Sequence, residues 1–363
     1  MKKFYFISFA ILSVLFTIFL TDFFLSNTFL KNNHCYDYES NQYYYELKKN
    51  CKGKYRFKSS FPLVKIYTDE NGLRIGKKKI LKDPNKPNIF IFGDSFTYGV
   101  GIEFEKTYAG LLALNLPNYN IYNFAVGSYS PSVHFYKLKK ALEKNLIPKK
   151  VIIFLDLTDV TDEATRWNYN FSNNTVSLSN NFVYKNNLEE KNDFKKQNFK
   201  ILTNLVSYIN YNIRFLKNKI KTEINNEYKI KTSIQGNFTY INANKLDKKF
   251  WKENSFEQGL KKISIIFDKI NNLAKIHNFE TFLVIYPWAE TLEFGQNAFN
   301  WSNFAKSICN DKCQTIDLIP DFIDYKNQNK FWSSDLYFIN DEHFNEKGAE
   351  LVYKTLLKKI NFN

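Results

Sequence analysis

Histidine and cysteine are scarce in this chain, with four of each among 363 residues. The sequence also lacks an internal repeat and any linker rich in glycine, serine or proline. It contains neither a G-x-G-x-x-G stretch nor a G-K-[ST] stretch, so a loop that cradles phosphate groups is not indicated. These absences argue against a repeat architecture and against phosphate binding. Because histidine and cysteine are so few, the chain also offers few candidates for a catalytic base or a metal ligand.

The composition is that of a folded and strongly basic protein. Apolar residues make up 44% of the chain, which predicts a globular protein, and a length of 363 residues allows one large domain or two ordinary ones. The formal net charge of +15 suggests nucleic acid as a partner. However, lysine is spread along the whole chain, without a basic cluster interleaved with aromatic residues, so we expect no nucleic-acid binding. The charge suits an anionic lipid or an acidic polysaccharide, unless it reflects only a lysine-rich composition.

Two lysines precede a long apolar run from Phe4 to about Leu25. This run is just long enough to span a membrane and is long for a signal peptide, and no convincing cleavage site follows it. We therefore expect residues 1–33 to form an uncleaved, single-pass anchor in the cytoplasmic membrane. The lysines favour a cytoplasmic N-terminus, which places the rest of the chain on the periplasmic or extracytoplasmic side. A cleaved signal peptide is the alternative.

All four cysteines follow this apolar run, and they allow three pairings. In an oxidising compartment the most economical pairing is the local one, so we expect the disulfides Cys35–Cys51 and Cys309–Cys313. A zinc site is the competing interpretation. It is less favoured because a C-x3-C spacing alone is a weak signal and only His34 lies near the first pair.

Short apolar runs alternate with helical patterns from about residue 86 onward. This alternation indicates βαβ units, a parallel sheet of five strands and a doubly wound, three-layer α/β domain. We expect this domain to span 86–363, to follow a small β-rich extension at 34–85, and to carry a partly helical insertion at about 164–254 that covers the site or forms a solvated appendage. The expected strands are 87–92, 119–125, 151–157, 281–286 and 314–318, and the expected helices are 107–116, 132–144, 256–277 and 346–360.

The first expected strand ends in the stretch IFIFGDSFTYGVG, which contains Ser95. Ligands of open α/β sheets bind at the carboxyl ends of the strands, so a serine on a tight turn there is a candidate nucleophile. The α/β-hydrolase elbow G-x-S-x-G does not fit, because Thr97 occupies the position of its last glycine.

A serine nucleophile needs a base, and His343 is the best candidate among the four histidines. It lies in the stretch FINDEHFNEKGAELV, in a loop just before the last expected helix. From there it could reach across the end of the sheet to the serine. Asp341 could accept the Nδ1 proton and fix the tautomer of the ring. Asn340 and Asp335 are the alternative orienting residues.

With these residues the chain resembles the SGNH (GDSL-type) hydrolases, from roughly residue 86 to the end. FGDSFTYG resembles the first block of that family and makes Ser95 the nucleophile. YNFAVGSYSPS resembles the second block, whose glycine amide helps to form the oxyanion hole. The matching position here is either Gly127 or Ser128.

The other two blocks depart from the family pattern. VIIFLDLTDVTDE resembles the third block, but Thr158 stands where the family has the asparagine that donates to the oxyanion. A threonine hydroxyl could donate with a shorter reach. NDEHFNEKG resembles the last block, but the family usually places its aspartate three residues before the histidine, where this chain has Asn340. We therefore expect Asp341 to take that role.

The resemblance implies a flavodoxin-like α/β/α fold and cleavage or transfer of an ester acyl group, with no metal and no cofactor. Family members outside bacterial membranes often act on acetylated carbohydrates. We therefore expect a serine ester hydrolase that acts on an acylated envelope carbohydrate or lipid, with an O-acetyl group as the expected acyl group. One alternative is an O-acetyltransferase of cell-envelope polysaccharide, to which a membrane partner could supply acetyl groups. The other is a non-catalytic glycan-binding protein.

The expected residue roles follow from this resemblance. Ser95, His343 and Asp341 would form the catalytic triad. The oxyanion hole would consist of the amide of Ser95, the amide of Gly127 or Ser128, and the hydroxyl of Thr158. Substrate-binding roles are expected for Asp94, for Asp159 and for Trp288, whose ring could stack on a sugar or lie in the core.

Overall fold

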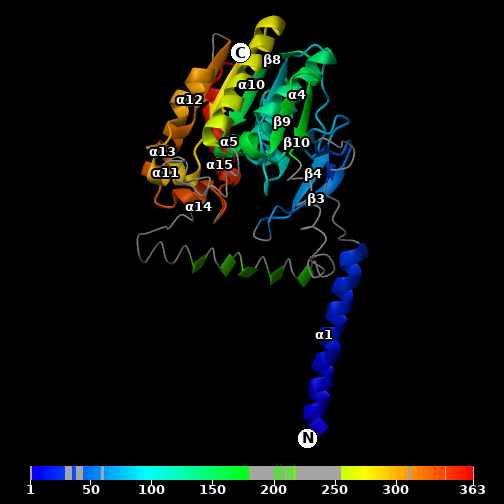
Figure 1. The fold of residues 1–363 in the computed structure, drawn as a ribbon. Helices are drawn as coiled ribbons and strands as arrows, with labels where there is room; N and C mark the ends of the chain where they lie inside the picture. The colour runs from blue at the N-terminus through cyan, green and yellow to red at the C-terminus, as the bar shows by residue number, and fades with distance from the viewer. Residues whose placement is uncertain are drawn as a thin grey trace. The chain divides into compact units, whose positions relative to one another are not determined.

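Figure 1 shows the computed structural model of the chain, which describes residues 2–28, 35–37, 44–58, 61–179, 255–309, 312–339 and 341–362, with short pieces between 201 and 217. Contacts divide the chain into two compact units. One unit contains the N-terminal helix and the pieces between 201 and 217, and the other contains the α/β domain. The two units are described separately below.

The first unit is built on α1 (Lys2–Thr28), whose segment Tyr5–Asn27 is long and apolar enough to cross a membrane. A signal sequence near an N-terminus has the same properties. The carboxylate of Asp22 accepts hydrogen bonds from Ser26 Oγ at 2.7 Å and from the backbone N–H of Ile201 at 2.9 Å. The described residues between 201 and 217 are helical, and Asp22 accepts a second backbone hydrogen bond from the Leu202 N–H at 2.9 Å.

The second unit contains a five-stranded parallel sheet in the order β12-β11-β8-β6-β7. Numbered along the chain, this order is 2-1-3-4-5 read from the other edge, which is the flavodoxin-like doubly wound order. The predicted fold class is therefore confirmed. The strands are β6 (Asn88–Phe92), β7 (Asn120–Asn123), β8 (Pro148–Leu155), β11 (Glu280–Ile285) and β12 (Cys313–Asp317).

Helices cover both faces of this sheet. Right-handed crossovers place the helix between β6 and β7 and the helix between β7 and β8 on opposite faces. The contacts agree, because α4 packs with α5 and α10 (Figure 1), whereas α3 packs with α15 on the other face. The helices are α2 (Ser95–Tyr98), the 3-10 helix η1 (Phe104–Lys106), α3 (Tyr108–Asn115), α4 (Pro131–Glu143), α5 (Leu157–Thr165), α10 (Phe256–His277), α11 (Ala289–Phe294), α12 (Trp301–Ile308), α13 (Ile319–Gln328), α14 (Trp332–Leu336) and α15 (Glu346–Lys359).

Local sequence signals explain where the long helices begin. Ser255 and Gln258 form a reciprocal capping box at the start of α10, and Asn345 accepts backbone hydrogen bonds at the start of α15. The strand expected at 151–157 ends earlier, because Asp156 caps α5 by accepting a hydrogen bond from the Thr158 N–H. The helix α5 and the short helices α11 to α14 were not among the helices expected from the sequence.

Three smaller antiparallel sheets accompany the main sheet. Two of them lie in the region expected to be β-rich, and the third is a hairpin in the expected insertion. Most of the insertion after residue 179 lies outside the described residues. The strands are β1 (Tyr36–Asp37) with β2 (Glu46–Leu47), β3 (Lys52–Tyr55) with β4 (Val64–Thr68) and β5 (Arg74–Ile75), and β9 (Trp167–Asn170) with β10 (Thr175–Leu178).

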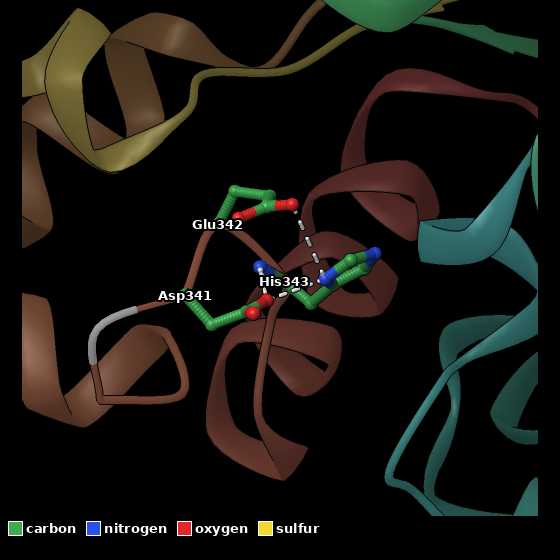
Figure 2. A group of neighbouring side chains, drawn as sticks. All are labelled: Asp341, Glu342 and His343. Carbon is green, nitrogen blue, oxygen red and sulfur yellow. Dashed lines mark hydrogen bonds and ion pairs between the residues drawn. The ribbon is translucent and has the colours of Figure 1, made fainter. Parts of the chain in front are cut away.

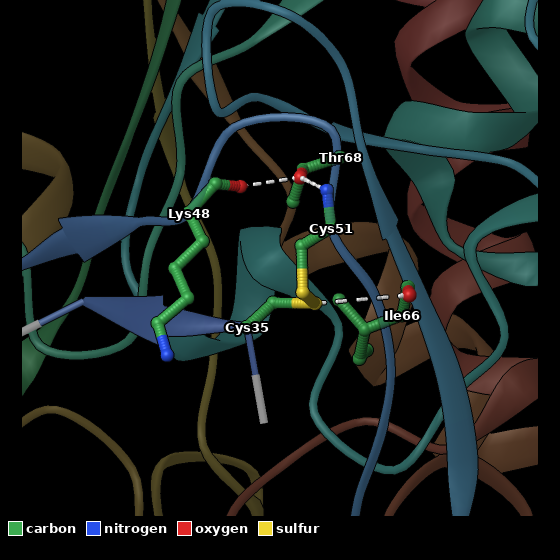
Figure 3. Close-up of a disulfide and its surroundings, with 5 residues drawn as sticks. All are labelled: Cys35, Lys48, Cys51, Ile66 and Thr68. Atoms are coloured by element: carbon green, nitrogen blue, oxygen red, sulfur yellow. Dashed lines mark hydrogen bonds between the residues drawn. A yellow bond between two sulfur atoms is a disulfide. The ribbon is translucent and has the colours of Figure 1, made fainter. Parts of the chain in front are cut away.

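The two disulfides are the predicted ones. Cys35–Cys51 ties the start of β1 to the start of β3, and Cys309–Cys313 ties the end of α12 to β12. Figure 3 shows the first of these, where the Cys51 N–H donates to Thr68 Oγ1 at 2.8 Å and Thr68 donates in turn to the Lys48 carbonyl. Lys48 and Cys51 are thus hydrogen-bonded to β4.

Candidate active site

Ser95 is the first residue of α2, directly after β6. The preceding Asp94 caps the helix by accepting a hydrogen bond from the Phe96 N–H at 2.9 Å. A Cβ atom at Gly93 would lie 2.0 Å from Thr97 Oγ1, so only glycine fits between the strand and the helix. The Gly-Asp-Ser sequence therefore forms a tight strand-to-helix turn that leaves Ser95 half-buried at the carboxyl end of the strand.

The structure brings Ser95 and His343 together although 248 residues separate them. His343 Nε2 lies 2.8 Å from Ser95 Oγ. On the other side of the ring, Nδ1 lies 2.5 Å from Asp341 Oδ1, and Figure 2 shows this carboxylate directed at the ring. With the Nδ1 proton held by Asp341, Nε2 is free to accept the serine hydrogen.

The surroundings of His343 make it a stronger base. Burial lowers the pKa of its imidazole, but the hydrogen bond and negative charge of Asp341 outweigh burial, so the pKa lies above its ordinary value. The ring also stacks on Phe96, with the ring centroids 4.7 Å apart. These contacts fix both the proton affinity and the orientation of the base.

The alternative orienting residues have different positions. Asp335 accepts hydrogen bonds from Tyr325 OH at 2.9 Å and from Lys347 Nζ at 3.0 Å, and its carboxylate is thus engaged elsewhere. Asn340 lies outside the described residues. Among the described candidates, Asp341 is the residue that contacts His343.

His343 and its two preceding residues have donor atoms that could ligate a metal ion. Asp341, Glu342 and His343 each offer one ligand atom, and these atoms lie within 4.8 Å of one another. Figure 2 shows Glu342 as the outer member, with its Oε1 4.0 Å from Nδ1. Both ring nitrogens are already engaged, by Asp341 and by Ser95. The arrangement therefore fits a hydrogen-bonded triad better than a metal centre.

The loop between β7 and α4 lies beside the serine. A Cβ atom at Gly127 would lie 3.9 Å from Ser95 Cβ. Within the described part of the chain, the N–H groups of Ser95, Gly127 and Ser128 donate to no protein acceptor. Free backbone donors next to a nucleophile are what an oxyanion hole requires.

Thr158, the third expected oxyanion donor, is turned to other partners. Its hydroxyl lies 2.5 Å from Asp156 Oδ1 and 3.3 Å from Asp94 Oδ2. A hydroxyl has a single hydrogen, and the short contact directs it to Asp156. In this arrangement Thr158 does not donate toward the position where an oxyanion would form.

A cluster of buried acids lies beneath Ser95. Tyr286 OH bridges it, at 3.4 Å from Asp94 Oδ1 and 3.2 Å from Asp156 Oδ2. Burial, together with the charge of Asp156, raises the pKa of Asp94 to about 7. Asp156 and Tyr286 were not among the residues expected in the site. The third block of the family that the chain resembles normally ends Gly-x-Asn-Asp, and this chain has Asp156 at the glycine position, which was a visible signal.

The expected substrate-binding roles need correction. Trp288 is 1% exposed and donates its indole N–H to Asp156 Oδ2 at 3.0 Å, so its ring is a core element and not a stacking surface. Asp159 is buried and accepts a hydrogen bond from the Asp156 N–H in the capping box of α5. Asp94 is also buried, beneath Ser95. None of the three side chains is exposed to solvent.

Comparisons with known proteins give a similarity in solved structures only. No protein-family model matches the chain, and no curated protein matches it. An acetyl xylan esterase is 14% identical, with 76% of this chain and 100% of that chain covered and a TM-score of 0.41. A lipolytic protein of the G-D-S-L family from Veillonella parvula is 9% identical (75% and 96% covered, TM-score 0.39). A catalytic mutant of an acetylxylan esterase from Geobacillus stearothermophilus is 11% identical (78% and 98% covered, TM-score 0.38).

Proposed function

We propose that this chain is a serine esterase that uses Ser95, His343 and Asp341. The observation that carries the proposal is the continuous chain of hydrogen bonds from Ser95 Oγ through the imidazole to Asp341 Oδ1, at 2.8 and 2.5 Å. This is the geometry of a nucleophile, a general base and an orienting carboxylate. The free backbone N–H groups beside the serine supply the complementary site for an oxyanion.

The reaction follows from this arrangement. Ser95 Oγ attacks the ester carbonyl while His343 Nε2 takes its proton, and the carbonyl oxygen becomes an oxyanion. Collapse of the tetrahedral intermediate breaks the bond to the alcohol, which leaves with the proton from His343. An acyl-enzyme remains on Ser95. Water, deprotonated by the same histidine, then attacks the acyl-enzyme and releases the acid.

The proposed substrate is a carbohydrate or lipid of the cell envelope that carries an ester-linked acyl group, namely an O-acetyl group. Support comes from α1, which is suited to anchoring the chain in the cytoplasmic membrane, and from the two disulfides, which are typical of an oxidising compartment outside it. The net charge of +15 favours an anionic envelope surface over a neutral one. Transfer of the acetyl group to a sugar hydroxyl would use the same acyl-enzyme.

A fluorophosphonate probe tests the proposal. The full-length chain in detergent is exposed to the probe beside its Ser95→Ala variant, and intact mass is measured. We expect one adduct on the parent chain, none on the variant, and hydrolysis of p-nitrophenyl acetate only by the parent. A mass increase on an added oligosaccharide would show acetyl transfer. A folded parent without any adduct would reject the esterase and support a non-catalytic glycan-binding protein.

A further inference from the structure

The oxyanion loop, residues 126–129, is held by side chains from outside the main sheet. The hydroxyl of Tyr45, just before β2, donates to the Gly127 carbonyl at 2.6 Å. The indole N–H of Trp167, at the start of β9, donates to the Ser128 carbonyl at 2.8 Å. Two consecutive carbonyls beside the nucleophile are thus fixed by groups that no catalytic motif contains.

Fixing the Gly127 carbonyl also fixes an N–H group. The peptide between Gly127 and Ser128 is planar and trans, so its carbonyl oxygen and its N–H point in opposite directions. A hydrogen bond from Tyr45 to the oxygen therefore sets the direction of the Ser128 N–H. No described protein acceptor takes this N–H.

The conformation of Ser128 needs such support. Its φ of +59° lies in the left-handed region, which residues other than glycine rarely adopt. Strained backbone of this kind persists where the surrounding contacts enforce it, and it is common at functional sites. Here Tyr45 binds the carbonyl that precedes Ser128, and Trp167 binds the carbonyl of Ser128 itself, so both peptide groups flanking its Cα are held.

Tyr45 is itself held in place on several sides. Its ring lies 5.7 Å from the ring of Tyr129 and 5.7 Å from that of Trp167, and Tyr129 OH donates to the Tyr45 carbonyl at 2.6 Å. The Lys48 N–H donates to the Cys35 carbonyl at 2.7 Å, and the disulfide closes the segment at residue 51. The described residues 44–51 therefore bring a fixed hydroxyl to the oxyanion loop.

We propose that Tyr45 is a positioning residue for the oxyanion hole and that its bond to Gly127 aims the Ser128 N–H at the developing oxyanion. The inference rests on the proposed esterase function. On this proposal, the small β-rich extension before the main domain contributes a side chain that supports the active site. The inference also favours the Ser128 amide over the Gly127 amide, the two alternatives from the sequence. Only the Ser128 N–H shares a peptide group with the carbonyl that Tyr45 binds.

The variant Tyr45→Phe tests the proposal, because it removes one oxygen and keeps the ring contacts. We expect kcat for p-nitrophenyl acetate to fall roughly 10- to 100-fold, since a misaimed donor costs somewhat less than a deleted one. KM should stay within about twofold. The pH profile should be unchanged, because His343 and Asp341 keep their contacts. Inhibition by a phenylboronic acid, whose adduct carries an oxyanion-like oxygen, should weaken in parallel with kcat.

Tyr44→Phe is the matched control. The hydroxyl of Tyr44 donates to Glu46 Oε1 at 3.0 Å within the same segment, and we expect the variant to keep the parental kcat. The inference fails if Tyr45→Phe keeps the parental kcat, or if both variants lose activity equally. If the parent chain itself reacts with neither substrate nor fluorophosphonate, the proposed function fails, and the inference fails with it. Activity in the parent with no effect of Tyr45→Phe rejects the inference alone.

Discussion

The hydrogen of the Ser95 hydroxyl has two acceptors within reach. His343 Nε2 lies at 2.8 Å and Asp94 Oδ2 at 3.3 Å. The carboxyl of Asp94 is buried beneath the serine, where burial and the charge of Asp156 raise its pKa to about 7. Near neutral pH the charge state of Asp94 therefore affects both the serine and the histidine next to it.

We predict that Asp94→Asn shifts the pH profile of kcat/KM. The proposed mechanism requires neutral His343, so activity should rise with pH as this residue loses its proton. The negative charge of ionised Asp94 is one of the causes that raise the pKa of His343. Removing that charge lowers this pKa, so the rising limb should move to lower pH. Asparagine also caps helices well, so α2 should form normally.

The rate of p-nitrophenyl acetate hydrolysis, measured across the titration range of histidine, checks this shift. Asp335→Asn is the control, because Asp335 is paired with Lys347 and is not among the groups that shift the pKa of His343. Its rising limb should match the parent. A rising limb that stays in place in Asp94→Asn would show that Asp94 is not charged when the histidine titrates.

A second substitution at this scale tests the role of Thr158. Because its hydroxyl is directed at Asp156, we expect Thr158→Val to lower kcat by less than about threefold, whereas loss of an oxyanion donor costs about 10²–10³. Valine has nearly the same shape as threonine, and the backbone N–H of residue 158 can still donate to Asp156. A loss of about 100-fold or more would show that the hydroxyl turns toward the oxyanion during the reaction.

Single residues of the site differ in how far the sequence could predict them. Ser95 and His343 lie in recognisable motifs, and their contact follows from the rule that sites gather at the carboxyl ends of parallel strands. The burial of Trp288 could not be predicted, because a strand end does not reveal which way a side chain points. The contact of Tyr45 with Gly127 spans 82 residues and belongs to no motif, so only the structure shows it.

At the scale of elements, the two disulfides should differ in their effect on activity. Cys35–Cys51 closes the segment that carries Tyr45, whereas Cys309–Cys313 closes a short connection between α12 and β12. With 16 residues of sequence separation against four, the first should stabilise the fold by about 3 kcal/mol and the second by about 2 kcal/mol. The difference in stability is small, so a difference in activity would come from the site.

We therefore predict that the double variant Cys35→Ser, Cys51→Ser loses most of its esterase activity while remaining folded. The double variant Cys309→Ser, Cys313→Ser should keep the parental kcat and lose a few degrees of Tm. Circular dichroism and p-nitrophenyl acetate hydrolysis, measured on both variants, separate folding from catalysis. Equal kcat values in the two folded variants would contradict a role of the first disulfide in holding the oxyanion loop.

At the scale of the whole molecule, the main sheet was the most predictable part. Its central strands β6, β8 and β11 contain short apolar runs because helices bury both faces, and such runs stand out in a polar, lysine-rich sequence, whereas the edge strands β7 and β12 contain more polar residues. The short helices α11, α13 and α14 were hard to predict because helices of so few residues depend on tertiary contacts more than on propensity. The helix α12 could have been found, because Trp301, Phe304, Ala305 and Ile308 follow a helical spacing. The helix α5 was hidden by Asp156, which ends an apolar strand and starts a helix at once.

The N-terminal helix and the cysteines give one joint prediction about where the chain resides. If α1 is an uncleaved anchor with its lysines on the cytoplasmic side, the whole α/β unit lies in an oxidising compartment, where both disulfides form. Intact mass of the chain extracted from membranes, after alkylation without reductant, should then show the full N-terminus and no alkylated thiol. A mass that begins after the apolar run would instead show a cleaved signal peptide. Alkylation of all four cysteines would place the active site on the reducing side, where an envelope glycan could not reach it.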